Sequence, residues 1–422
     1  MLRTVLAAFA LLGACNGFGG FPAAALQTGG GAGRRVPGNG DLAAPRFAEG
    51  GGGTFLALQG RDEFGILSIF ALNSVSLERT LVSRANPFAD PLTGAVAEPI
   101  PDRGAEDGSV STTGQWALFL SEATNLVGPV RTTENRTHAY LHDVAAGTTT
   151  LVDRGPAGEE GNGDVSSAAF SADGRFVAFA SDATNLVPAA NSGIPQVFLW
   201  DRLTGRTELL SFAVRNGVVF PGGGESGETA IAGNGRFVAF ASAANDLVEG
   251  DTNPGADLFL RDRSLRTTVR VNLGPGGITF LAEPGEPSVS RDGLVVAFTA
   301  LSVPGGSRQV FVRDRATGTT VVVSQNPAPG DADSAAPRVS PDGRFIVFES
   351  DATNLVAGDA NGARDVFVFD RVSGTLRRVT VNADGIESDG ESGDASISPD
   401  GRVIAFVSRA RNLVNPTPSE PT

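Results

Sequence analysis

The 422-residue sequence is short of the residues that most catalytic and metal centres use, with one cysteine, two histidines and no lysine. A single cysteine leaves no partner for a disulfide and too few thiolates for a zinc site. His138 and His142 lie about 13 Å apart if their segment is a strand, which is too far to share one metal ion. Neither a zincin motif nor a Gly-x-Ser-x-Gly elbow is present. Triad, thiol and zinc chemistry are therefore disfavoured, whereas carboxylate catalysis remains open.

Negative charge dominates the chain, because 47 acidic residues outnumber 33 arginines and give a net charge of −14. This balance disfavours nucleic acid and acidic lipid as partners. The 55 glycines and 25 prolines indicate many turns, and helical patterns are scarce.

The N-terminus predicts an exported lipoprotein. Met1–Cys15 reads MLRTVLAAFALLGAC, in which one arginine precedes an apolar stretch too short to span a bilayer. Its end, Leu12–Cys15, resembles the lipobox of bacterial lipoproteins, which implies acylation of Cys15. The alternative is an ordinary signal peptide cut after Ala25. Asn16 follows the cysteine, so the resemblance implies anchorage in the outer membrane, and residues 16–42 are expected to be a glycine-rich tether.

A repeated segment organises residues 43–414. Four copies are nearly alike and begin at Phe170 (FSADGRFVAFASDATNLV), Ala232, Val339 and Ile397, with weaker copies from Glu49, Ser111 and Ser290. Matching positions recur every 50 to 61 residues, a period typical of a propeller or solenoid. Each copy continues into a second β-rich pair, such as DVFVFDRVSGTLRRV from Asp365, so each unit predicts four antiparallel strands, a to d.

The expected fold is therefore an all-β propeller of four-stranded antiparallel blades. Seven b strands but six c–d pairs are recognisable, which favours seven blades with the last incomplete. Six blades closed by the C-terminal pair are the alternative. Residues 415–422 are expected to be a tail.

The SPDGR and DxFxxDRxTG segments resemble the TolB-type repeat of bacterial envelope propellers. This resemblance implies the fold and an envelope location, but not a function, because many propellers share the repeat. TolB carries an α/β domain before its propeller, where this sequence has only the predicted tether. We therefore do not expect Tol–Pal function.

Two b–c loops share an Asp-x-Asn-x-x-x-Asp pattern, at Asp251, Asn253 and Asp257 and again at Asp359, Asn361 and Asp365. The equivalent positions of the preceding copy are Ala190, Ser192 and Gln196, so the complete Asp, Asn and Asp set is present in two copies and is lost as a set in this one. Such sets suit Ca²⁺, although three side chains fall short of its usual six to eight ligands. The alternative is that these side chains cap their own turns.

Charge is segregated by loop type. Strands a and c run in the same direction, so the d–a and b–c loops share one face of the propeller. The a–b and c–d turns on the opposite face collect arginines, including Arg175, Arg236, Arg344 and Arg371. The d–a loops contain sixteen acids and no arginine: Glu106, Asp107, Glu159, Glu160, Asp164, Glu225, Glu228, Glu283, Glu286, Asp331, Asp333, Asp384, Glu387, Asp389, Glu391 and Asp394. The aspartates of the DG and DR turns are expected to be structural.

These patterns favour a non-catalytic, lipid-anchored envelope propeller that binds a protein or glycan through its acidic face, with calcium as the candidate cofactor. Binding is expected rather than catalysis, by a monomer that touches the membrane only through its lipid. A carboxylate-dependent hydrolase or lyase acting on an extracellular polymer is one alternative. A structural envelope protein stiffened by calcium is the other.

Overall fold

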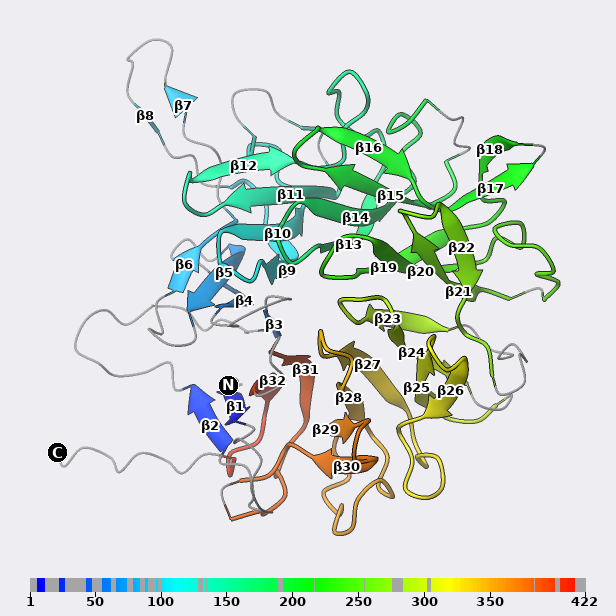
Figure 1. The fold of residues 1–422 in the computed structure, drawn as a ribbon. Coiled ribbons are helices and arrows are strands. Elements are labelled where there is room, and N and C mark those ends of the chain that lie inside the picture. Colours follow the sequence, from blue (N-terminus) through cyan, green and yellow to red (C-terminus); the bar gives the residue numbers. More distant parts are fainter. Residues whose placement is uncertain are drawn as a thin grey trace.

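The residues that the computed structural model describes form strands and turns, and none of them lies in a helix (Figure 1). The described residues are 6–11, 23–26, 43–47, 55–61, 66–73, 79–83, 88–89, 96–97, 101–127, 132–133, 135–188, 193–215, 217–253, 255–274, 284–301, 305–382, 384–398 and 403–413. Within these ranges no helix has the length and apolar character needed to cross a membrane. The predicted all-β class is confirmed.

The described strands form seven four-stranded antiparallel sheets and two hairpins. The first three sheets are β3 (Ala43–Phe47), β4 (Phe55–Arg61), β5 (Leu67–Asn73) and β6 (Arg79–Leu81); β9 (Ala105–Val110), β10 (Trp116–Ser121), β11 (His138–Asp143) and β12 (Thr148–Leu151); and β13 (Val165–Phe170), β14 (Phe176–Ser181), β15 (Gln196–Asp201) and β16 (Arg206–Leu209). The next three are β19 (Ser226–Ile231), β20 (Phe237–Ser242), β21 (Asp257–Asp262) and β22 (Thr267–Arg270); β23 (Gly285–Val289), β24 (Val295–Leu301), β25 (Arg308–Asp314) and β26 (Thr319–Val322); and β27 (Ser334–Val339), β28 (Phe345–Ser350), β29 (Asp365–Asp370) and β30 (Thr375–Arg378). Their order within each sheet is the predicted a–b–c–d.

The seventh sheet joins the two ends of the described chain. It contains β31 (Ser392–Ile397), β32 (Val403–Ser408), β1 (Leu6–Leu11) and β2 (Ala23–Leu26). β1 pairs with β32 from Leu6 opposite Ser408 to Leu11 opposite Val403. β1 therefore takes the place of strand c, although the sequence assigns it to the signal segment, and β2 falls in the predicted tether. Cys15 and residues 415–422 lie outside the described residues.

The seven sheets surround a common centre. Figure 1 shows the first strand of each sheet nearest that centre and the last strand at the periphery. Consecutive first strands contact one another from β3 through to β31, and β31 in turn contacts β3. The first and seventh sheets are thus neighbours through their innermost strands. The two hairpins, β7 (Phe88–Ala89) with β8 (Val96–Ala97) and β17 (Phe212–Arg215) with β18 (Val218–Pro221), are insertions between sheets.

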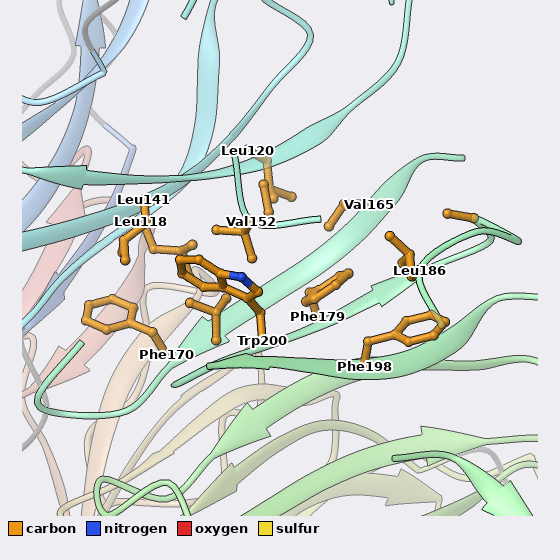
Figure 2. Close-up of a cluster of buried hydrophobic side chains, with 13 residues drawn as sticks. Leu118, Leu120, Leu141, Val152, Val165, Phe170, Phe179, Leu186, Phe198 and Trp200 are labelled. Carbon is orange, nitrogen blue, oxygen red and sulfur yellow. The ribbon is translucent and has the colours of Figure 1, made fainter. Parts of the chain in front are cut away.

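The hydrophobic core lies between successive sheets. Figure 2 shows one such layer, in which Leu118 and Val152 of the second sheet meet Phe179 and Trp200 of the third. The middle strands are buried on both sides, since four consecutive residues of β14 are fully covered. This explains why the VAF runs lack the polar alternation of a strand with one wet face.

Each of five sheets has an aromatic pair where strand b faces strand c. Phe240 and Phe259 are directly opposed in the ladder, and their ring centroids are 5.9 Å apart. The equivalent pairs are Phe119–Tyr140, Phe179–Phe198, Phe298–Phe311 and Phe348–Phe367. Offset stacking of this kind adds about 0.5–1.5 kcal/mol to the burial of the rings.

The a–b turns have the structural role that the sequence predicts. Asp342 accepts hydrogen bonds from the Ser340 hydroxyl (2.6 Å) and the Arg344 backbone N–H (3.0 Å). Gly343 follows with φ of 73°, and a Cβ there would lie 2.8 Å from Val295 of the neighbouring sheet. Only glycine fits this turn, because both the left-handed backbone and the close approach exclude a side chain.

Candidate functional site

The loop triplet at Asp251 closes around an arginine of its own sheet. Nη1 of Arg270, the last residue of β22, lies 2.8 Å from Asp251 Oδ1 and 2.9 Å from Asp257 Oδ2. Asn253 Oδ1 is 2.9 Å from the same nitrogen. The three predicted oxygens do converge, and a guanidinium nitrogen lies at the point where they meet.

The triplet at Asp359 is built in the same way with one more acid. Nη1 of Arg378, the last residue of β30, lies 3.3 Å from both Asp359 and Asp365 and 2.7 Å from Glu387. The side-chain amide nitrogen of Asn361 faces Asp365 at 3.3 Å, while its oxygen accepts the Ala363 N–H. Glu387, from the following d–a loop, replaces the asparagine oxygen as the third acceptor.

Three carboxylates of this second cluster are close enough to hold a metal ion. Ligand oxygens of Asp359, Asp365 and Glu387 all lie within 4.8 Å of one another. Burial raises the pKa of Asp359 to about 6, even though Arg378 opposes that shift. In the first cluster burial, followed by the charge of Asp257, raises the pKa of Asp251. Both clusters thus concentrate negative charge that needs a cation, and in this arrangement arginine supplies it.

The third sheet lacks the triplet, and it also lacks the arginine. In the third sheet Gln196 takes the place of Asp257 and Asp365, and Leu209 ends β16 where the fourth and sixth sheets have arginine. The absence of the triplet from this copy was recognised in the sequence, but the absence of the arginine from the same copy was not. Their joint absence is the sequence signal that could have identified arginine as the cation.

A polar pair recurs near the start of strand c in the second to sixth sheets. Its two members are fifteen residues apart: His138–Asp153, Gln196–Ser211, Asp257–Asn272, Gln309–Ser324 and Asp365–Thr380. Gln196 accepts from the Ser211 hydroxyl at 2.7 Å, and Asp257 accepts from the Asn272 amide at 2.7 Å. The second sheet has His138 and Asp153 at these positions, with Nδ1 of His138 2.6 Å from Asp153 Oδ2. Both side chains are fully buried.

Arginines on the face of the a–b and c–d turns are engaged in ion pairs. Arg344 contacts Asp370 through Nε and Nη2, the latter at 2.8 Å, and this contact lowers the pKa of Asp370 to about 2. Equivalent fork-shaped pairs join Arg175 to Asp201 and Arg236 to Asp262. The strand-c aspartates therefore balance the charge of Arg175, Arg236 and Arg344 locally.

Several acids of the opposite face bind neutral N–H donors instead. Glu228 accepts the backbone N–H of Glu286 at 2.6 Å, and Glu286 accepts that of Ala336 at 2.8 Å. Asp164 and Asp389 likewise accept the N–H groups of Thr137 and Arg411. These bonds hold the carboxylates in place through neutral donors rather than through a cation.

The innermost strands carry exposed acids at β-bulges. Asp107, Glu228, Glu286 and Asp394 have φ values of 50°, 47°, 52° and 51°. Each lies where the register of a first strand shifts against its neighbour. All four are exposed and belong to strands that surround the centre in Figure 1. Positive φ is costly for such residues, and strain of this kind concentrates at functional sites.

No family model and no curated protein matches the chain. Among solved structures, it resembles the β-propeller domain of the Trilobed protease from Pyrococcus furiosus, at 9% identity and a TM-score of 0.51 over 90% of this chain and 99% of that one. It also resembles the acylaminoacyl peptidase of Pyrococcus horikoshii, at 10% identity and a TM-score of 0.50 over 89% of this chain. The fold is a β-propeller. The match spans 52% of the peptidase chain, so peptidase activity does not follow from it.

A putative TolB from Agrobacterium tumefaciens is similar at 16% identity and a TM-score of 0.43, over 74% of this chain and 92% of that one. A likeness this distant does not identify a relative of this propeller.

Proposed function

We propose that this chain is a seven-bladed, non-catalytic propeller whose acidic face binds a positively charged segment of a protein or a cationic group of a glycan. The observation that carries the proposal is the asymmetry of charge balance between the two faces. Arg175, Arg236 and Arg344 of one face form fork-shaped ion pairs with aspartates, whereas Glu228 and Glu286 of the other face accept backbone N–H groups and are exposed on the innermost strands. Carboxylates fixed around the centre of the ring attract and orient a cationic partner.

A fluorescent nona-arginine peptide tests this face directly. We expect the peptide to bind, and the double change Glu228→Gln and Glu286→Gln to weaken binding by about tenfold, because each lost rim charge contributes about 0.7 kcal/mol. Glutamine keeps the oxygen that accepts the neighbouring N–H, so the fold should persist. Added salt should weaken the wild-type complex.

The matched control removes two negative charges near the opposite face, by Glu208→Gln and Asp314→Asn. These acids pair with Arg263 and Arg371. An equal loss of affinity in both double variants would mean that net charge alone attracts the peptide. Binding unchanged by Glu228→Gln and Glu286→Gln would exclude this face.

We also propose that Cys15 carries a lipid anchor in the outer membrane of a bacterial envelope. The support is the lipobox Leu12–Cys15 and the position of the only cysteine. Processing would remove β1, leaving β31 and β32 to close the ring through the contact between β31 and β3.

The expected result is a mature chain that begins at acylated Cys15, seen by mass spectrometry of the membrane fraction. Cys15→Ser should leave an unprocessed or soluble form. A Cys15→Ser protein that stays with membranes after a high-salt wash, or a mature chain that retains Met1–Leu11, would contradict the anchor.

Calcium at the two loop triplets stays a prediction, and Arg270 and Arg378 are its competitors. We propose that the arginines provide the permanent cation of both clusters. Their Nη1 atoms lie within 3.3 Å of the carboxylates that a calcium ion would need.

A further inference from the structure

His138 has one satisfied and one unsatisfied ring nitrogen. Nδ1 lies 2.6 Å from Asp153, whose other oxygen accepts the Ala139 N–H. Nε2 is buried and has no hydrogen-bond partner in the part of the chain that the structure describes. It faces Glu160 Oε1 at 3.6 Å, beyond the length of an ordinary hydrogen bond. When Nδ1 carries the proton that Asp153 accepts, two lone pairs face each other across this gap.

In the sixth sheet the side chains equivalent to His138 and Glu160 have an arginine between them. Asp365 starts its third strand as His138 starts that of the second sheet, and Glu387 bridges to Val381 as Glu160 bridges to Arg154. There Nη1 of Arg378 lies between Asp365 and Glu387. The second sheet ends its fourth strand with Leu151 in place of that arginine. It therefore retains the two flanking groups without an arginine at the position of Arg378, although the charge of Arg136 also acts on His138.

We propose that His138 Nε2 and the Glu160 carboxylate bind a divalent transition-metal ion of the zinc class. Ligands at about 2.0–2.1 Å in a tetrahedral or slightly wider arrangement lie about 3.3–3.6 Å from each other, which agrees with the observed gap. Asp153 acts as the outer carboxylate that fixes the tautomer of a metal-binding histidine. The other coordination positions belong to water or to an incoming ligand.

Access and selectivity follow from the same residues. The side chain of Glu160 is 25% exposed, so an ion reaches the buried nitrogen from the acidic face. The Thr133 N–H holds Glu160 Oε1 at 3.0 Å and orients the carboxylate. Imidazole nitrogen favours zinc and its neighbours over Ca²⁺ and Mg²⁺, which prefer oxygen alone.

The test titrates untagged, EDTA-treated protein with Zn²⁺, using calorimetry and thermal unfolding, with Ca²⁺ and Mg²⁺ as comparisons. We expect one Zn²⁺ per chain, and at a hundredfold excess over Kd a rise in Tm of about 1–2 °C, because a given stabilisation shifts Tm little in a long chain. Co²⁺ in place of Zn²⁺ should give the visible absorption of a tetrahedral site with a nitrogen ligand.

The chain offers its own matched variants. His138→Gln with Asp153→Ser reproduces the Gln196–Ser211 pair of the third sheet, so this double variant should fold and lose the zinc response. Glu160→Gln should lower the affinity at least tenfold, whereas Glu159→Gln, which changes the adjacent acid, should leave it unchanged. A zinc response that survives in the His138→Gln and Asp153→Ser variant would overturn the proposal.

A proton is the competing occupant of the gap. An imidazolium between Asp153 and Glu160 would give no zinc response and no cobalt spectrum in the wild type. Its stabilisation would fade as pH rises through the pKa of His138, and this pH dependence would disappear in the double variant. That combination of results would also overturn the metal site.

Discussion

Arg378→Ala should lower the free energy of unfolding by about 3–5 kcal/mol, since removing one partner of a buried ion cluster leaves the remaining charges uncompensated. The side chains of Arg378, Asp359 and Asp365 are 8%, 3% and 1% exposed, so water replaces little of the lost cation. Chemical denaturation gives the measurement. Arg377→Ala, at the exposed neighbouring position of β30, is the matched control and should change stability by no more than about 0.5 kcal/mol.

Calcium separates the two interpretations of the cluster. In Arg378→Ala the three carboxylates are free to bind Ca²⁺, which at a hundredfold excess over Kd should restore about 2.7 kcal/mol. The wild type should respond weakly, because its guanidinium lies among the ligands. Strong stabilisation of wild type by Ca²⁺, abolished by Asp359→Ala with Asp365→Ala, would show instead that calcium is the native cation.

Phe240→Ala should lower the free energy of unfolding by about 3–5 kcal/mol. It removes a large buried side chain and leaves a cavity that the close-packed neighbouring side chains fill only in part. Phe240 is fully buried, stacks on Phe259 and packs among residues of the third sheet. The guanidinium chloride midpoint should fall. Phe220→Ala, at a side chain that is 45% exposed on the β17–β18 hairpin, removes the same atoms and should cost less than about 1 kcal/mol. Equal losses in the two variants would contradict the placement of the core between sheets.

Repetition made the fold readable from the sequence. The DG turns, the VAF runs and the second β-rich pairs correspond to β13–β16, β19–β22 and β27–β30 with the predicted strand order. The bulges at Asp107 and Glu228 were not predicted, because a bulge depends on how two strands meet rather than on either strand's composition. The β17–β18 hairpin was missed for a different reason. Like β7–β8, it is an insertion in the connection between two sheets and lies outside the repeated segments.

The candidate sites were predictable only in part. Co-occurrence of Asp251, Asn253 and Asp257 identified groups that do converge in space. The cation that balances them is Arg270, the last residue of β22. Its contact with the loop depends on the register between β21 and β22, which the loop motif does not encode. His138 was judged as a partner for His142, whereas its neighbours are Asp153 and Glu160, which reach it from the following loop.

The ring arrangement also has a consequence for the order of folding. Most pairings within a sheet join strands that are neighbours in sequence, so sheets can form one after another as the chain emerges. The contact of β31 and β32 with β3 is different, because it joins the two ends of the propeller and must wait until β31 and β32 have been synthesised. Until then, the first sheet presents to solvent the side that these strands later cover. We therefore expect ring closure to be the slow, high-contact-order step, and a chaperone that shields this sheet before closure would act on an intermediate with one open end.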